Sequence, residues 1–201
     1  GPVQAQDGSW QDTVRWVPDG DTLYLESGRV VRLKGIDAPE LNHEDGPDQY
    51  YARESRQGLQ VLVDDITLRI VPSTVDTDRF NRVLAEIRLP DGRFLNQLML
   101  EKGLAFIYPH QEQRLTDQGA LLSAQKEAMN QMRGFWARIL TMKEAGATFL
   151  GNRRSKRFHR WDCPFGRSMS HSNRVEFSSL RQAFAAGYAP GRGCTPWPSS
   201  E

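Results

Sequence analysis

The stretch VVRLKGIDAPE, residues 30–40, decides the fold that we expect for this chain. Its first part is rich in apolar and β-branched residues, which favours a strand. Because alternate side chains of a strand lie on one face, Arg32 and Lys34 share a face of that strand. Asp37 and Glu40 then follow at a turn that contains a proline. Taken alone, this pattern is typical of a solvated strand end, so its meaning depends on the surrounding segments.

The surrounding segments predict more short strands, with helices between and after them. Asp-Gly and Ser-Gly pairs mark turns on both sides of residues 22–25, and they stand too close together for a helix. Apolar residues recur at helical spacing in three other segments. This order predicts an α+β chain: a five-stranded oligonucleotide-binding barrel of Greek-key type with about three helices, plus a small α/β module at the C-terminus. The expected strands are residues 14–17, 22–25, 30–36, 66–71, 83–89 and 104–108, and the expected helices are residues 49–63, 94–102 and 115–136.

Length and composition allow one domain of ordinary size with a small addition. The chain has 201 residues, of which 38% are hydrophobic and 25% charged, so a wholly disordered chain is excluded. No run approaches about 18 apolar residues, which excludes a membrane-spanning helix. The first residues lack the charged and apolar regions of a leader, so we expect that a signal peptide is absent or already removed.

The charges are distributed unevenly along the chain. Residues 1–150 carry 17 Lys and Arg against 22 Asp and Glu, whereas residues 151–201 carry nine against three. A basic stretch of this kind is either a contact surface for a polyanion or a solvated charged face. We therefore expect one domain over residues 10–140 and a small basic module over residues 147–198.

Four positions can supply oxygen ligands and a base. Asp21 and Asp37 both stand in turns, and carboxylates are ligands that hard cations such as Ca²⁺ prefer. A backbone carbonyl near Ala38 can add a neutral ligand. Glu40 can stay off the metal and activate a water molecule as a general base. Each of these residues alone is more often part of an ordinary turn.

Two arginines complete a set that suits phosphoryl transfer. Arg32 lies within the quoted stretch, and Arg82 ends the sequence TDRFNR, residues 77–82, just before a predicted strand. Guanidinium groups bind phosphate through paired hydrogen bonds that lysine cannot reproduce. Hydrolysis of a phosphodiester needs a metal, an oriented water molecule and positive charge near the transition state.

With these parts in this order, the chain resembles the staphylococcal nuclease (thermonuclease) family. The resemblance runs over about residues 16–136 and rests chiefly on VPDGDT at residues 17–22, RLKGIDAPE at residues 32–40 and TDRFNR at residues 77–82. Each motif alone is weak, but their conjunction along the chain is specific. The resemblance implies a five-stranded oligonucleotide-binding barrel and Ca²⁺-dependent hydrolysis of DNA and RNA.

The resemblance also implies a metal site and a catalytic carboxylate. Asp21 and Asp37 would hold Ca²⁺ together with the backbone carbonyl of Ala38. Glu40 would orient or deprotonate the attacking water. Ala38 stands where the best-known member of the family has Thr, which is harmless if the residue contributes only its carbonyl.

The resemblance implies contacts to the substrate as well. Arg32 and Arg82 would bind the scissile phosphate and stabilise the transition state. Arg79 would contact the substrate. Tyr108 can stack on a base, although ordinary packing is the role that we favour for this side chain. Asn81 stands where the family usually has Gly, which can alter how the following arginine is presented.

The C-terminal module resembles a degenerate Ada-type zinc-binding domain. His159 and Cys163 fit the first ligand pair of that domain, but Gly191 stands where the second pair should begin, and Cys194 alone remains. A closed structural zinc site needs four ligands, so zinc is not the favoured state. Three states stay open for the two cysteines: a disulfide, which we favour, residual zinc ligands, or free thiols.

The resulting hypothesis is a Ca²⁺-dependent nuclease that hydrolyses DNA and RNA with little sequence specificity. The alternative is a catalytically inactive module that binds nucleic acid or protein, although such copies usually lose the acids or arginines that are present here. We predict DNA and RNA as substrates, no protein partner, and a secreted or periplasmic location, and we predict no particular oligomeric state. The basic run at residues 153–160 either contacts nucleic-acid backbone or packs as a charged rim on the acidic domain.

Overall fold

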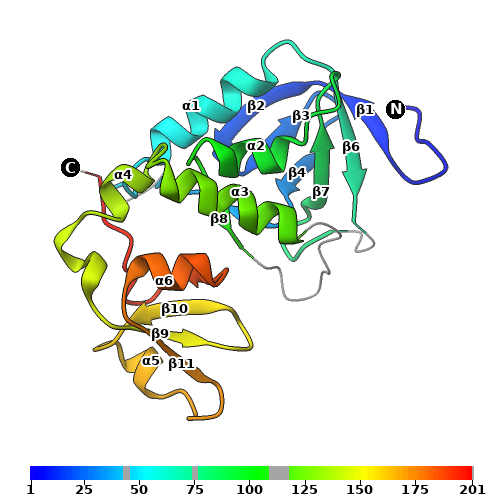
Figure 1. Cartoon of the computed structure of the whole chain (residues 1–201). Helices are drawn as coiled ribbons and strands as arrows, with labels where there is room; N and C mark the ends of the chain where they lie inside the picture. The colour runs from blue at the N-terminus through cyan, green and yellow to red at the C-terminus, as the bar shows by residue number, and fades with distance from the viewer. Residues whose placement is uncertain (43–45, 74–76, 109–117, 201) are drawn as a thin grey trace.

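The computed structural model describes residues 1–42, 46–73, 77–108 and 118–200. The predicted helix start at residue 115 and parts of the loops at residues 42–48 and 72–81 lie outside the described residues. Figure 1 shows a strongly curled sheet with helices packed against it, and the C-terminal residues as a smaller lobe. The predicted α+β class is therefore confirmed. In the part of the chain that the structure describes, no helix is both long and apolar enough to cross a membrane.

The first strands of the chain build one curled sheet and one short pair. They are β1 (Trp10–Asp12), β2 (Val14–Asp19), β3 (Thr22–Leu25), β4 (Val30–Leu33), β5 (Ile36–Asp37), β6 (Leu68–Pro72), β7 (Val83–Arg88) and β8 (Phe106–Ile107). Among the described residues the sheet has the order β1-β6-β7-β4-β3-β2. Its neighbours run antiparallel except β4 and β7, which run parallel. The antiparallel pair of β5 and β8 is separate from this sheet.

Two strand predictions need correction. The sequence predicts one strand over residues 30–36, but the chain divides into β4 and β5 at Gly35, whose φ of +81° breaks the extended conformation. The strands expected from the sequence also omit β1, which lies at the edge of the sheet. β1 is too short to show an alternating pattern, and it is held by its buried Trp10, whose indole N–H donates to Asp12 at 3.0 Å.

Helices accompany the sheet, and the last of them is shorter than predicted. α1 (Ala52–Val63) and α2 (Leu95–Glu101) follow the prediction, whereas α3 (Gln118–Asn130) ends early and α4 (Trp136–Ile139) is a separate turn. The reason is a close backbone approach between Gly134 and Gly103, where a Cβ on Gly134 would overlap the facing carbonyl oxygen. The chain must leave the helix to make this approach, and it then re-enters the core at the fully buried Trp136.

One buried amide ties α2 to the sheet. The Nδ2 group of Asn96 donates to the carbonyl oxygens of Lys34 at 2.9 Å and Ala85 at 3.1 Å. Its Oδ1 accepts the N–H of Ile87 at 3.1 Å. The apolar core around this residue includes Leu23, Leu33, Ile36, Leu59, Ile70, Leu95 and Leu100.

The C-terminal module has a sheet of its own. Its elements are η1 (Lys143–Gly146), β9 (Phe149–Asn152), β10 (Arg157–Arg160), α5 (Pro164–Arg167), β11 (Arg174–Phe177), α6 (Leu180–Ala185) and β12 (Ala189–Pro190). The strand order is β11-β9-β10-β12, with β10 and β12 parallel. Ser179 caps the start of α6, because the N–H of Gln182 donates to its hydroxyl at 3.0 Å.

The two cysteines of the module are joined as a disulfide. Their Cα atoms lie 5.7 Å apart. Cys163 comes after β10 and Cys194 comes after β12, so the bond links the regions that follow two neighbouring strands. His159 lies close by, with its Nδ1 atom 2.8 Å from the carbonyl oxygen of Gly193. Of the three states that the sequence leaves open, the structure contains the disulfide, in which neither thiol is available as a metal ligand.

The module and the larger part of the chain share an aromatic core. The ring of Phe106 in β8 lies 5.2 Å from that of Trp197 near the C-terminus, measured between centroids. Trp136 in α4 packs edge-on against Phe184 in α6 at 4.7 Å. All four side chains are buried. The two parts therefore do not have fully independent cores.

Hydrogen bonds also join the two parts. Gln125 in α3 is fully buried; its Oε1 accepts the N–H of Ile107 at 2.6 Å, and its Nε2 donates to the carbonyl of Phe184 at 2.9 Å. The indole N–H of Trp197 donates to the carbonyl of Tyr50 at 2.9 Å. These bonds fix the position of the module on the larger part.

Replacing Asn96 with alanine should destabilise the fold. The change removes three hydrogen bonds, and although the Ala85 carbonyl still accepts the N–H of Lys34, the Lys34 carbonyl and the Ile87 N–H lose the bonds that Asn96 makes to them. We therefore expect a loss of about 3 kcal/mol in the free energy of unfolding. Chemical denaturation measures it. The neighbouring change Gln97→Ala, at a half-exposed side chain bonded to Glu101, should cost under about 1 kcal/mol. Equal losses for the two variants would contradict the role of Asn96.

Candidate functional site

Arg32, on β4, is the centre of the candidate site. Its side chain is 8% exposed. Its Nη1 group donates to the carbonyl oxygens of Leu33 and Ile36, each at 2.9 Å. Its Nη2 group lies 3.3 Å from a carboxylate oxygen of Asp37 and 3.3 Å from one of Asp21. The guanidinium therefore brings the end of β5 and the turn between β2 and β3 to one point.

The turn between β2 and β3 holds Asp21 in a fixed orientation. The N–H of Ala38 donates to its Oδ2 atom at 2.9 Å, and the hydroxyl of Thr22 donates to its Oδ1 atom at 3.0 Å. The N–H of Asp21 in turn donates to the carboxylate of Asp19 at 3.1 Å. The Asp-Gly-Asp turn thus presents two acidic side chains to the same place.

The acidic side chains carry more negative charge than Arg32 balances. Burial raises the pKa of Asp37 above its ordinary value; Arg32 opposes this rise and Asp21 adds to it. Burial and the neighbouring Asp21 likewise raise the pKa of Asp19. Burial also acts to raise the pKa of Asp21, but the charge of Arg32 and the hydrogen bonds from its neighbours, including the N–H of Ala38, together hold this pKa below its usual range. A further cation in this place would be favoured electrostatically.

The donor set fits a hard divalent cation. Within the described ranges, no three or more His, Cys, Asp or Glu side chains are grouped so as to hold a metal ion by themselves. Ca²⁺ accepts about six to eight oxygen ligands, which include backbone carbonyls and water as well as carboxylates. Asp21, Asp37 and the carbonyl of Ala38 would supply enough protein ligands, with water molecules completing the coordination shell. The excess negative charge around Arg32 favours the same ion.

Glu40 lies beside this acidic group on the segment that follows β5. Its N–H donates to the side-chain oxygen of Gln49 at 2.8 Å, and its carbonyl accepts the N–H of Gln49 at 2.9 Å. The side chain is exposed. The backbone is therefore fixed while the carboxylate can reach water.

Arg82 is presented by a tight loop before β7. Its Nε and Nη2 groups each lie 2.8 Å from the Oδ2 atom of Asp78. The other oxygen of Asp78 accepts the N–H groups of Phe80 at 2.9 Å and Arg82 at 3.0 Å. Asn81 has a φ of +60°, which asparagine tolerates better than most residues, so the replacement of the usual glycine keeps the loop conformation.

All of these side chains line one cavity of about 440 Å³. Every residue that the sequence singled out for catalysis, metal binding or substrate contact lies there. They are Asp21, Arg32, Asp37, Ala38, Glu40, Arg79, Arg82 and Tyr108. The cavity thus joins two acids and an arginine from the centre of the fold with two arginines from the loop before β7.

Charged residues that the sequence did not single out also line the cavity, among them Asp78, Arg157 and Arg192. Asp78 positions Arg82, and it was visible only as part of the loop motif. Arg157 and Arg192 come from the C-terminal module and line the same cavity. Arg157 stands in the basic run at residues 153–160, which was the only signal for it.

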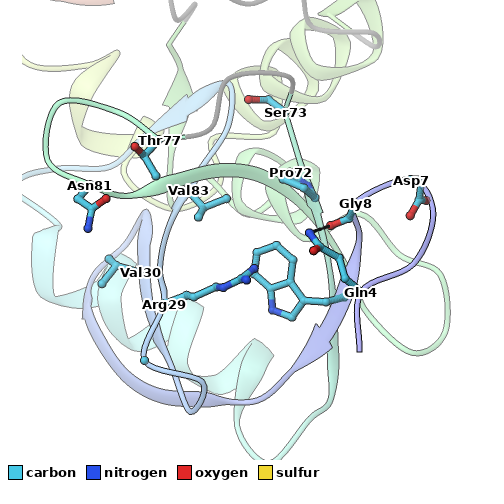
Figure 2. A pocket seen from close by; sticks show the side chains of 12 residues that line it. Gln4, Asp7, Gly8, Arg29, Val30, Pro72, Ser73, Thr77, Asn81 and Val83 are labelled. Carbon is cyan, nitrogen blue, oxygen red and sulfur yellow. Dashed lines mark hydrogen bonds between the residues drawn. The ribbon is translucent and has the colours of Figure 1, made fainter. Parts of the chain in front are cut away.

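A second hollow, of about 650 Å³, lies on another face of the fold (Figure 2). Arg29 points into it, with its guanidinium carbon 4.4 Å from the centre of the Trp10 ring. Among the described residues that line it, the one acid is Asp7, which is exposed and paired with Arg69 at 2.9 Å. The hollow therefore lacks the paired acids of the smaller cavity, and we place the chemistry in the smaller one.

Known proteins resemble much of this chain. An endonuclease of Escherichia coli, named as uncharacterized, is 36% identical over 124 residues, which are 60% of this chain and 73% of that protein. A probable staphylococcal-like nuclease of Oryza sativa subsp. japonica, CAN1, is 33% identical over 61% of this chain and 34% of its own length. The endonuclease YhcR of Bacillus subtilis is 24% identical over 90% of this chain but only 17% of its own length.

The family comparison agrees with these relatives. The family model described as staphylococcal nuclease homologue matches residues 30–138, more than half of the chain. The matched range contains the arginines and acids of the cavity from Arg32 to Arg82. The chain therefore belongs to the staphylococcal nuclease homologue family.

Proposed function

We propose that this chain is a nuclease that uses Ca²⁺ to hydrolyse phosphodiester bonds in DNA and RNA with little sequence specificity. Membership of the family and the endonuclease names of the relatives support a nuclease. The observation that carries the finer proposal is the meeting of Asp21, Asp37, Glu40, Arg32 and Arg82 in one cavity. Oxygen ligands, a carboxylate base and two guanidinium groups are the parts that phosphodiester hydrolysis needs.

The metal site belongs to the turn after β2 and the end of β5. Asp21, Asp37 and the carbonyl of Ala38 would hold Ca²⁺. When bound, this ion would polarise a phosphoryl oxygen and offset negative charge in the transition state. Glu40 lies next to this site with an exposed carboxylate, and it would orient a water molecule and accept its proton.

The two arginines would act on the phosphate from different sides of the cavity. Burial alone would lower the pKa of Arg32, but Asp21 and Asp37 outweigh it and raise the pKa, so the group stays charged. Arg82 is half-buried and held in direction by Asp78. Arg79 is exposed on the same loop, with its guanidinium carbon 4.7 Å from the centre of the Phe80 ring, and would contact the substrate further from the reacting phosphate.

The disulfide supports a proposal about location. Disulfides persist in oxidising compartments and are rare in the cytosol. We place the enzyme in a secreted or periplasmic setting, with DNA and RNA as its partners and no protein partner.

A chelator-controlled cleavage assay tests the proposal. Purified protein should cut single-stranded DNA and RNA in the presence of Ca²⁺ and stop when a chelator removes the ion, because the acidic group needs the added cation. Gel analysis of the products measures this. A protein that cuts neither polymer with any of several divalent ions would be an inactive binding module.

Replacing Glu40 with glutamine should slow the reaction with little effect on folding. We expect a fall in kcat of about 10²–10⁴-fold, because the amide cannot accept a proton from water. The matched control is Glu54→Gln, which changes an exposed carboxylate on α1 that does not line the cavity. A fall in kcat of less than about tenfold for Glu40→Gln would show that Glu40 is not the general base.

Replacing Asp78 with alanine should weaken catalysis through Arg82. We expect kcat/KM to fall about tenfold, as for Arg82→Lys, because both changes lose the directed guanidinium. The double variant should fall little further, since Asp78 acts through the same arginine. Asp91→Ala removes a similar pair, with Arg93 at 2.7 Å, away from the cavity and should leave kcat/KM unchanged. Additive losses in the double variant would contradict this link.

A further inference from the structure

Arg157 reaches from the C-terminal module into the nuclease cavity. It is the first residue of β10, which is paired on both sides by β9 and β12. Its Nη1 group lies 3.6 Å from the Oδ2 atom of Asp37, and its guanidinium carbon lies 4.0 Å from the centre of the Tyr108 ring. Its side chain is 18% exposed. One arginine of the module thus contacts two residues of the cavity that belong to the nuclease part.

The guanidinium of Arg157 has spare hydrogen-bonding capacity. It carries five N–H donors, and one hydrogen-bond acceptor is found for them among the described residues, the carbonyl of Pro190 at 2.7 Å. The pair with Asp37 is too long for a hydrogen bond. The nearer carboxylate contact of Asp37 is with Arg32, at 3.3 Å. The remaining N–H donors of this half-buried arginine can therefore bind a strong acceptor, such as a phosphate oxygen.

Arg192 is a second arginine of the module that lines the cavity, and it is exposed. The segment that carries it is fixed at both ends. Before it, the N–H of Gly191 donates to the carbonyl of Phe158 at 2.8 Å. After it, Cys194 is bonded to Cys163. The disulfide and β12 therefore fix the segment that presents this second cation to the cavity.

The cations of the cavity come from separate parts of the chain. Arg79 and Arg82 come from the loop before β7, and Arg157 and Arg192 come from the module. Arg32 comes from β4. A substrate that carries one phosphate needs only the arginines near the acids, whereas a chain of phosphates can also use those of the module.

We infer that Arg157 and Arg192 form a phosphate subsite that the C-terminal module adds to the nuclease cavity. It takes a phosphate group of the nucleic-acid chain next to the one that is cleaved. The subsite rests on the proposed function, because it supposes that a phosphodiester occupies the cavity. It makes the module part of the substrate-binding surface, and it gives the enzyme a preference for substrates with more than one phosphate.

The test compares two substrates in the full-length protein. One is a short single-stranded DNA oligonucleotide, and the other is bis(p-nitrophenyl) phosphate, which has a single phosphodiester. In Arg157→Gln the ratio of kcat/KM for the oligonucleotide to that for the small ester should fall about tenfold, the size expected for loss of a charge-assisted hydrogen bond. Arg192→Gln should lower the same ratio by a smaller factor, because its side chain is more exposed.

Salt dependence gives a second readout. The slope of log KM for the oligonucleotide against log salt concentration should decrease by about 0.7 for each arginine that is removed. The control is Arg160→Gln, which removes an exposed arginine of the same strand that does not line the cavity. This variant should change neither the ratio nor the slope.

Two results would overturn the subsite. If Arg157→Gln lowers both kcat/KM values by the same factor, or lowers only the melting temperature, the residue serves the structure alone. If the ratio and the slope are those of the Arg160→Gln control, no phosphate binds there.

An inactive wild-type protein would instead overturn the proposed function. In that case, fluorescence anisotropy with the same oligonucleotide, labelled, in the presence of Ca²⁺ measures whether the subsite contributes to binding. Binding should weaken about tenfold in Arg157→Gln and stay unchanged in Arg160→Gln. Equal binding by these two variants would end the inference.

Discussion

A guanidinium group buried as deeply as that of Arg32 is stable only beside fixed negative charge. Asp21 and Asp37 supply that charge, and each is held there by the turn or strand end that carries it. The same contact therefore joins β4 to the turn after β2 and to β5. It also leaves the acidic side chains incompletely neutralised, which favours the binding of a divalent cation beside them. One electrostatic cluster thus holds this region of the fold together and prepares its chemistry.

Two different kinds of interaction position the other arginines of the cavity around this cluster. The loop before β7 uses Asp78 to cap its own backbone and to direct Arg82 at once. The C-terminal module instead relies on a shared aromatic core and on buried Gln125, which together fix where Arg157 stands. The contact between Asp78 and Arg82 is local in sequence. The packing that positions Arg157 depends on contacts between residues that are far apart along the chain.

This difference explains what the sequence could and could not predict. Turn residues placed Asp21 in a turn and Asp37 next to a strand, and alternation placed Arg32 within a strand, because local rules govern those positions. The division of residues 30–36 at Gly35 was not predicted. The end of α3 was missed because the approach of Gly134 to Gly103 is a tertiary constraint. Arg157 was visible only as one cation in a basic run, since nothing local shows that it faces Asp37. The role of each residue in catalysis stays a prediction.

The shared aromatic core has a consequence for how this protein can be divided. Phe106 and Trp136 belong to the larger part, yet they are covered by Phe184 and Trp197 from beyond residue 147. A fragment that stops at residue 140 would keep the acids and both family arginines but expose these rings to solvent. Loss of activity in such a fragment would therefore report on its solubility as much as on its chemistry. Point substitutions in the intact polypeptide are the cleaner way to separate the contributions of the two lobes.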